Sequence, residues 1–173
     1  SNILNEIDND MRSNKRMFRL LQGDVGSGKT IVSLISALNV IKSGYQVALM
    51  VPTEILAKQH YNFATKFFRE NIKIELLTGK TEYSIRKKII ENIKLNKTNL
   101  IIGTHALFQK DVTFKKLGLV IIDEQHKFGV KQRINLSNKG GRNCDILLMS
   151  ATPIPRTLVL SIYGDMDVSR LIE

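Results

Sequence analysis

Residues 23–30 read Gly-Asp-Val-Gly-Ser-Gly-Lys-Thr and match the phosphate-binding pattern G-x-x-x-x-G-K-[ST] at every fixed position. The glycines allow the backbone to curl, so that successive N–H groups can point into one concavity. Lys29 can reach the outer phosphates of a nucleotide, and the Thr30 hydroxyl can hold a magnesium ion. An ordinary glycine-rich turn between a strand and a helix is the alternative. The pattern favours a nucleoside triphosphate site made of Gly23, Asp24, Val25, Gly26, Ser27, Gly28, Lys29 and Thr30.

A second group of candidate residues follows the apolar run at 119–122, which is typical of a parallel strand buried on both faces. The run ends in Asp123, Glu124, Gln125 and His126. Ligands of open α/β folds bind at the carboxyl ends of the strands, where these side chains would lie. Asp123 would hold magnesium through its water shell, and Glu124 would orient and deprotonate the attacking water. Gln125 and His126 would sense the γ-phosphate. The alternative interpretation of the two adjacent acids, Asp123 and Glu124, is a solvated turn after the strand.

Ser150, Ala151 and Thr152 also follow an apolar run directly, at residues 146–149. Their two hydroxyls could hydrogen-bond to the acidic motif and link hydrolysis to movement. Alone the tripeptide is uninformative, because Ser and Thr often begin turns and Pro153 follows. Its place in the chain, after the phosphate loop and the acidic motif, makes it a candidate coupling element.

The order of these motifs resembles the first motor domain of superfamily-two helicases and translocases. Longer stretches resemble the RecG family of bacterial fork-remodelling helicases in particular, namely residues 20–30, 52–57, 103–107, 150–158 and 163–169. The transcription-repair coupling translocases share much of the stretch at 150–158. They tend to have Glu and Thr where this chain has Gln125 and Ser150. The resemblance runs through nearly the whole chain.

The resemblance implies an α/β fold, specifically a RecA-like P-loop NTPase domain with a mostly parallel central sheet and helices on both faces. It implies ATP and Mg2+ as cofactors, and branched or forked duplex DNA as a sequence-independent partner. A second RecA-like domain of the parent protein would supply arginines to the γ-phosphate. Residues 15–173 would then be motor domain 1 of a larger ATP-dependent DNA helicase, without the second motor domain and the wedge domain. Lys29 and the acidic motif would carry catalysis, and the isolated fragment should be nearly inactive.

Two alternatives to a helicase remain open at this point. A transcription-repair coupling type of translocase would move on DNA without separating its strands. A stand-alone nucleotide-binding module or a small-molecule kinase would share only the phosphate loop. A kinase should have an arginine-rich lid and no Ser-Ala-Thr after a second apolar strand, so the sequence disfavours it.

Two further strand ends are candidate DNA contacts. Their residues are Pro52, Thr53 and Glu54 at the first, and Gly103, Thr104 and His105 at the second. Each would present backbone N–H groups and a hydroxyl at one edge of the sheet, a geometry suited to phosphate oxygens rather than bases. The alternative is that both threonines cap helices without a ligand. A basic helix at 82–95 could also touch DNA, although such a face is more commonly only solvated.

Apolar strands alternate with helical patterns, as expected of a parallel sheet covered on both faces. The predicted strands span residues 17–22, 46–51, 73–77, 99–103, 119–123 and 145–150. Three helices are predicted: one directly after the phosphate loop, one at 54–68 and one at 82–95. In the helix after the phosphate loop, the residues expected to face the sheet are Ile31, Leu34, Ile35, Leu38 and Ile41. In the helix at 54–68 they are Leu56, Phe63 and Phe67, and in the helix at 82–95 they are Ile85, Ile89 and Ile93. The polar segment 1–14 is expected to be loosely ordered, and residues 1–2 are candidate remnants of an expression tag.

Composition agrees with one soluble, nucleic-acid-binding domain. The 173 residues suffice for one domain with a sizeable core, and the net charge of +10 favours a polyanionic partner. An AT-rich genome would by itself also enrich Lys, Asn and Ile. No apolar run is long enough to span a bilayer, and the single Cys144 suits a reducing compartment, so a cytoplasmic, monomeric protein is expected. His60, His105 and His126 have no metal-ligand spacing.

Overall fold

The computed structural model describes residues 2–12, 18–23, 28–69, 71–123, 144–150 and 167–170. Its helices are α1 (Asn2–Arg12), α2 (Lys29–Lys42), α3 (Glu54–Phe67) and α4 (Tyr83–Lys94), with a short 3-10 helix, η1 (His105–Phe108). Its strands are β1 (Phe18–Gln22), β2 (Gln46–Met50), β3 (Ile74–Leu77), β4 (Leu100–Gly103), β5 (Leu117–Asp123), β6 (Asp145–Ser150) and β7 (Asp167–Arg170). The candidate residues at 24–27, 124–126 and 151–152 lie outside the described part of the chain.

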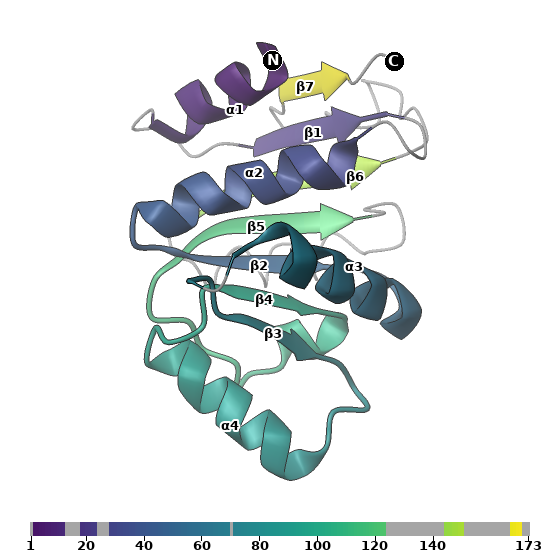
Figure 1. The fold of residues 1–173 in the computed structure, drawn as a ribbon, viewed down its shortest axis with the longest axis vertical. Helices are drawn as coiled ribbons and strands as arrows, with labels where there is room; N and C mark the ends of the chain where they lie inside the picture. Colours follow the sequence, from purple (N-terminus) through teal and green to yellow (C-terminus); the bar gives the residue numbers. More distant parts are fainter. Residues whose placement is uncertain are drawn as a thin grey trace.

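The strands form one sheet in the order β3-β4-β2-β5-β6-β1-β7, and every described pair is parallel (Figure 1). Because the strands share one direction, their carboxyl ends lie at the same edge of the sheet. All strands predicted from the sequence are present, with bounds that differ by at most two residues. The additional strand β7 was missed because its sequence, Asp-Val-Ser-Arg, lacks a continuous apolar run.

Burial explains why the central strands read as continuous apolar runs. Every residue of β2, β4, β5 and β6 is buried, which requires apolar side chains on both faces instead of an alternating pattern. Strand β3, at the edge of the sheet, is buried only at Leu77. The central strands could therefore be recognised in the sequence because both of their faces are buried in the sheet.

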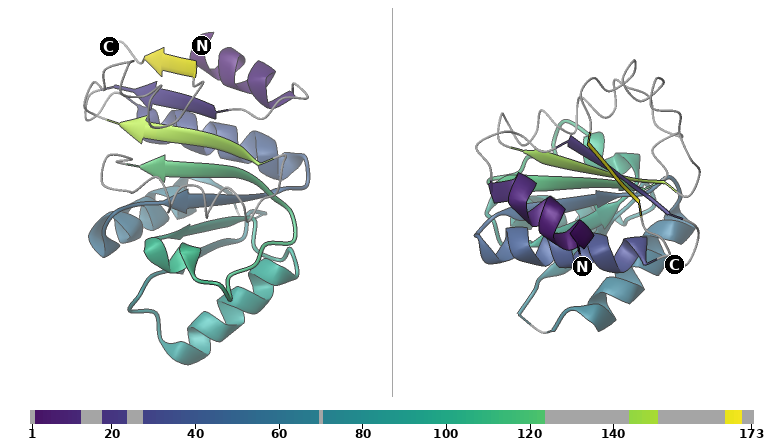
Figure 2. Two further views of the ribbon diagram at one scale, coloured as in Figure 1. Left: turned by 180° about the vertical axis from the view of Figure 1, so that it is seen from behind. Right: turned by 90° about the horizontal axis from the view of Figure 1, so that it is seen from above.

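Helices cover both faces of the sheet, as predicted. One core cluster joins the first face to α1, α2 and α3, through residues that include Ile7, Leu34 and Ala57. The second cluster joins the opposite face to α4 and η1, through residues that include Ile89 and Leu107. Figure 2 shows α1 and α2 together on one side of the sheet. No helix within the described ranges is long and apolar enough to cross a bilayer.

The beginning of the chain is a helix, so the expectation of a loosely ordered segment is wrong for Asn2–Arg12. Its apolar side chains recur at helical spacing, at Ile3, Leu4, Ile7 and Met11. Ile7 is 1% exposed and belongs to the same core cluster as residues of α2. The polar average composition concealed this narrow apolar stripe. Helix α1 is therefore packed against the domain.

The predicted inward face of α3 is largely wrong. The buried residues of this helix are Ala57 and Ala64, whereas Phe63 and Phe67 are 42% and 37% exposed. Small alanine side chains allow the helix to approach the sheet closely. The two large rings lie on the outer side and stack on each other, with centroids 6.2 Å apart.

The predicted faces of α2 and α4 agree better with the structure. Four of the predicted inward residues are buried: Leu34 and Ile41 in α2, and Ile89 and Ile93 in α4. In each helix the first predicted residue instead lies outward, with Ile31 45% exposed and Ile85 52% exposed. Both of these residues belong to the first turn of their helix.

Candidate functional site

Three neighbouring strands end at three of the predicted motifs. Gln22 at the end of β1 is paired with Ser150 at the end of β6, and Asp123 at the end of β5 is paired with Met149. The Gly23 N–H donates a hydrogen bond to the Ser150 carbonyl at 3.2 Å. The topology thus brings the start of the phosphate loop, the first acidic residue and the first residue of the Ser-Ala-Thr motif to one edge of the sheet.

The amino terminus of α2 lies at this edge without a cap of its own. Gly28 is the N-cap residue and has a φ of 88°, in the left-handed region that strongly favours glycine. Among the residues that the structure describes, no side chain caps the helix, and its first turn contains no acidic residue. Lys29 and Thr30 form the start of this turn. The partial positive charge of the helix terminus is therefore available to a bound anion.

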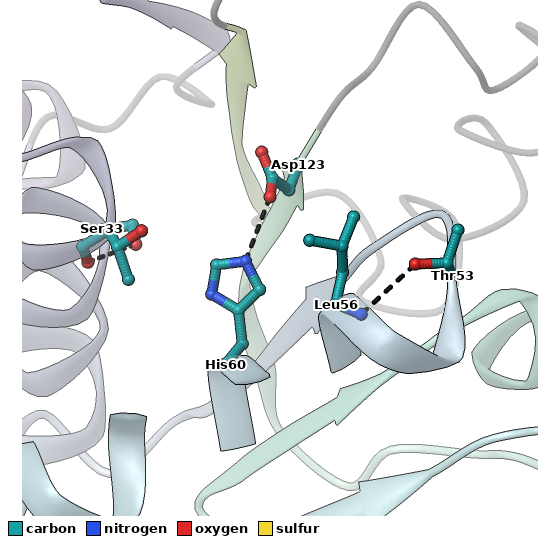
Figure 3. A network of polar contacts seen from close by, with 6 residues as sticks. Ser33, Thr53, Leu56, His60 and Asp123 are labelled. Carbon is teal, nitrogen blue, oxygen red and sulfur yellow. Dashed lines mark hydrogen bonds and ion pairs between the residues drawn. The ribbon is translucent and has the colours of Figure 1, made fainter. Parts of the chain in front are cut away.

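The Asp123 carboxylate has a hydrogen-bonding partner from another element. His60 Nε2 of α3 lies 3.1 Å from Asp123 Oδ2, and the two side chains are only 12% and 13% exposed. Figure 3 shows the imidazole ring directed from α3 toward the end of β5, with Ser33 on the neighbouring helix α2. Because an ionised carboxylate can only accept, Nε2–H is the donor. The Asp123 carboxylate is thus hydrogen-bonded to a side chain of α3.

The amino terminus of α3 is built from the predicted DNA segment. The Thr53 hydroxyl accepts a hydrogen bond from the Leu56 N–H at 3.2 Å, so Thr53 caps the helix. The predicted cap at this threonine is therefore present, while a DNA contact at the same segment stays a prediction. The adjoining Pro52 is half-buried and Thr53 is exposed, so this segment lies at the surface.

Glu54 links this terminus to the turn that follows β3. Its Oε1 accepts a hydrogen bond of 2.6 Å from the Thr78 hydroxyl, and its Oε2 lies 3.4 Å from Lys80 Nζ. The Thr78 hydrogen bond, followed by the interactions with Lys80, lowers the pKa of the Glu54 carboxyl below its ordinary value. The carboxylate is engaged in these contacts, and the backbone N–H groups of Glu54 and Ile55 are the donors left for a phosphate.

The second predicted DNA segment is more enclosed. A Cβ on Gly103 would lie 2.1 Å from the Leu77 carbonyl oxygen, so close packing of β4 against β3 requires glycine at this position. Thr104 is 5% exposed and makes no side-chain cap to η1, so capping does not explain this threonine. His105 is the exposed residue of the three.

A profile described as DEAD/DEAH box helicase matches residues 3–160. The chain belongs to the DEAD/DEAH box helicase family. The matched range begins in α1 and runs past the end of β6, so it includes all of the strand ends described above. In this family member, the phosphate loop, the acidic motif and the Ser-Ala-Thr motif follow one another along the chain in that order.

Similar curated proteins are RecG helicases. The chain is 55% identical to the ATP-dependent DNA helicase RecG of Thermotoga maritima over 169 residues, which cover 97% of this chain and 22% of that protein. It is 52% identical to the ATP-dependent DNA helicase RecG of Bacillus subtilis over 174 residues, covering 100% of this chain and 25% of that protein. The chain spans about a quarter of the length of these relatives.

Solved structures agree with the fold. RecG bound to a three-way DNA junction matches with a TM-score of 0.84 and 51% identity, over 99% of this chain and 23% of that chain. The UvsW helicase from bacteriophage T4 matches with a TM-score of 0.69 over 96% of this chain and 58% of that chain. At 16% sequence identity, this match is evidence for the fold alone. The predicted parallel α/β architecture of RecA-like helicase domains is therefore confirmed.

The sequence did not reveal the role of His60 in this helicase domain, because a test for metal-ligand spacing cannot detect a hydrogen bond to a carboxylate. A usable signal was present. His60 lies three residues after Ala57 and four before Ala64, on the face of α3 that packs inward. A polar side chain on such a face needs a partner, and the nearby strand ends carry polar groups.

The basic helix α4 of this helicase domain is partly committed to structure. Arg86 Nη1 lies 2.6 Å from Asp111 Oδ2, and its Nη2 lies 2.8 Å from Asp111 Oδ1. The hydrogen bonds to the Asp111 carboxylate raise the pKa of Arg86. The Gln109 side-chain oxygen accepts a further hydrogen bond from Arg86 Nη2. Lys87 and Lys88 are exposed, as a solvated face would be.

Proposed function

We propose that this chain is the ATP-binding first motor domain of an ATP-dependent DNA helicase, which remodels stalled replication forks and recombination junctions by translocating on duplex DNA. The observation that carries the proposal is the convergence of Gly23, Ser150 and Asp123 at the ends of three neighbouring strands. The RecG relatives support it, since they match almost the whole chain at 52% and 55% identity. The domain would work with a second RecA-like domain of the same parent protein.

The phosphate loop would hold the nucleotide. Its glycines would direct backbone N–H groups at the phosphates, and Gly28 would join the loop to the uncapped terminus of α2. Lys29 would make a charge-assisted contact with the outer phosphates. The absence of an acid from the first turn of α2 supports this role, because a carboxylate there would repel the phosphates.

Thr30 and Asp123 are the residues that would hold magnesium. Their hydroxyl and carboxylate oxygens are the kind of hard ligand that this ion prefers. Within the described residues, no group of three or more His, Cys, Asp or Glu side chains could hold a metal. Magnesium usually keeps several waters and is bound through one or two protein oxygens together with phosphates. When bound, magnesium would neutralise charge on the phosphate oxygens.

The acidic motif would carry hydrolysis and its coupling to movement. Glu124 would orient and deprotonate the attacking water, while Gln125 and His126 would sense the γ-phosphate. Ser150, Ala151 and Thr152 would relay the change toward the rest of the domain. Arginines of a second domain stabilise transition-state charge in related enzymes by roughly 10³–10⁵-fold in rate. Without them, this domain alone should hydrolyse ATP little or not at all.

DNA would lie along the same carboxyl edge, at the start of α3. The N–H groups of Glu54 and Ile55 have no acceptor within the helix, and they would bind phosphate oxygens without reading the sequence. The exposed His105 would lie near the same track, while the enclosed Gly103 and Thr104 would shape the segment. Binding of this kind weakens steeply as salt is raised.

The test uses the full-length helicase that contains this domain. Glu124→Gln should bind ATP as the wild type does, but hydrolyse it roughly 10²–10⁴-fold more slowly, because the general base is lost. ATP binding, DNA-stimulated ATP hydrolysis and the unwinding of a branched duplex would be measured on the same preparations. Hydrolysis by Glu124→Gln at the wild-type rate would exclude the assigned base.

The unwinding measurement also separates the proposal from its nearest alternative. A translocase would hydrolyse ATP on duplex DNA and displace bound protein, but would not separate the strands of a branched substrate. The identities of 52% and 55% to proteins named RecG helicases favour strand separation. DNA-stimulated hydrolysis without any unwinding would point instead to the translocase.

A further inference from the structure

The contact between His60 and Asp123 joins two parts of the molecule that the proposed function uses separately. Asp123 lies at the end of β5 and would help to hold magnesium, whereas His60 belongs to α3. Both side chains are nearly buried, so water competes little for the hydrogen bond of 3.1 Å between them. The imidazole therefore determines which way the carboxylate points.

Helix α3 connects this contact to the segment proposed to meet DNA. His60 follows Glu54, the first residue of the helix, by six positions, which is about 9 Å along the helix axis. A helix of this length moves as one body, so a displacement of its first turn also displaces the imidazole. Only a fraction of an ångström is needed to alter a hydrogen bond of this length.

The first turn of α3 is itself held by contacts that a bound phosphate could change. Thr53 caps the turn, and Glu54 ties it to Thr78 and Lys80 in the turn after β3. A phosphate near this terminus would attract Lys80 and repel the Glu54 carboxylate. The position of α3 relative to β5 would then depend on whether DNA is present.

We propose that His60 is a positioning residue through which DNA bound at the start of α3 sets the orientation of the Asp123 carboxylate. The inference rests on the proposed function and deepens it, because it names the contact that transmits DNA binding to the nucleotide site. His60 itself touches neither nucleotide nor DNA. Its effect on hydrolysis is exerted through the carboxylate that it holds.

The experiment compares two substitutions at this position in the full-length helicase. His60→Leu fills similar space without a donor, whereas His60→Gln places an N–H donor at nearly the same reach. Asn62→Leu is the matched control, since Asn62 is an exposed neighbour on the same helix. Thermal unfolding would first establish that each variant is folded.

The readouts are the turnover number of ATP hydrolysis with and without branched DNA, the DNA concentration for half-maximal stimulation, and the affinity for Mn2+ with ADP. Loss of a hydrogen-bonding partner of a metal-ligating carboxylate typically costs 10–100-fold in affinity or activity. His60→Leu should therefore lower DNA-stimulated turnover and Mn2+ affinity by about tenfold, and basal turnover by much less. The DNA concentration for half-maximal stimulation should stay within about twofold of wild type, since the DNA segment is unchanged. His60→Gln should recover most of both losses.

Several results would overturn the inference. Full DNA stimulation in His60→Leu would show that the contact transmits nothing, and equal losses in His60→Leu and His60→Gln would show that the donor is irrelevant. An equal fall in basal and stimulated turnover would leave His60 a support of Asp123 without coupling. If Asn62→Leu lowered DNA-stimulated turnover as much as His60→Leu does, the effect would not be specific to the contact between His60 and Asp123. Wild-type protein that DNA does not stimulate would contradict the proposed function as well, while the Mn2+ affinities would still report on the contact.

Discussion

Two helices begin at the carboxyl edge of the sheet, and their first turns are built in opposite ways. Helix α2 begins at Gly28, which has a positive φ; its first turn has no acidic residue, and no described side chain caps it. Helix α3 begins at Thr53, whose hydroxyl caps it, and Glu54 follows in the first turn. One terminus is left for a ligand, and the other is largely satisfied by its own residues.

The difference matches what each terminus is proposed to bind. A helix amino terminus carries the equivalent of about half a positive charge. In the first turn of α2 no acidic residue offsets this charge, which suits a polyphosphate that must be held through a catalytic cycle. In α3 the Glu54 carboxylate offsets part of it, so a DNA phosphate would be held weakly. A motor that steps along DNA needs contacts that it can release.

The largest effect expected from the contrast between the two helix termini concerns two lysines that share a local sequence. Gly-Lys-Thr occurs at 28–30, at the start of α2, and again at 79–81, in the turn beside α3. Lys29→Ala should weaken magnesium-ATP binding by about ten- to a hundredfold, because a charge-assisted hydrogen bond is lost. Lys80→Ala should leave the affinity unchanged, since Lys80 pairs with Glu54. Calorimetry on the full-length helicase measures both, and equal affinities in the two variants would remove the distinction between the termini.

A smaller effect is expected at the cap of α3. Thr53→Ala removes the hydroxyl that accepts from the Leu56 N–H, and should lower the free energy of unfolding by about 1 kcal/mol. Thr53→Ser keeps the cap and should restore most of this loss. The alanine variant should also impair DNA stimulation of hydrolysis more than nucleotide binding, whereas Thr104→Ala should have less effect because Thr104 is enclosed. If Thr53→Ala kept full stability and full DNA stimulation, the cap would be unimportant to either.

The smallest predicted effect is a pH dependence at Glu54. The Thr78 hydroxyl holds the pKa of this carboxyl below its ordinary value of 4.5. A carboxyl whose pKa is lower in the folded state stabilises the fold above the unfolded pKa, and this contribution is lost as the pH falls through the folded pKa. The stability difference between wild type and Glu54→Gln should therefore be present at neutral pH and shrink below pH 4.5.

Urea unfolding at several pH values measures this difference. Thr78→Val is the matched variant, because it removes the main cause of the lowered pKa while keeping the side-chain shape. In that background the pH dependence of the Glu54→Gln difference should be much weaker. A stability difference that grew toward low pH would have the wrong sign and would contradict the assigned contact.

The parallel sheet, and the meeting of the candidate motifs at its carboxyl edge, could be predicted from the sequence. Buried strands such as β5 are continuous apolar runs, and motifs at their ends must meet when the strands are parallel. The packing of helices was less predictable. Apolar periodicity suggested that Phe63 packs inward. Ala57 and Ala64 are buried instead, because their small side chains allow α3 to approach the sheet more closely. Size, as well as hydrophobicity, decides which face packs.

The contact between His60 and Asp123 could not be predicted for a different reason. It depends on where α3 lies relative to β5. In the sequence, β3, α4, β4 and η1 separate these two elements. Strand order β4-β2-β5 decides that position, and no single segment encodes it. The narrow stripe of α1 was, in contrast, visible in the sequence at Ile3, Leu4, Ile7 and Met11, and average polarity concealed it.

Amide NMR spectra of the domain test the contrast between the two helix termini most directly. Magnesium-ADP at high concentration should shift the backbone amides of residues 28–30 and leave those of residues 54–56 nearly unmoved. Branched duplex DNA at low salt should instead shift the amides of residues 54–56, with smaller changes at 28–30. Nucleotide-induced shifts that appear at residues 54–56 and spare residues 28–30 would contradict the assignment of the nucleotide to α2 and of DNA to α3.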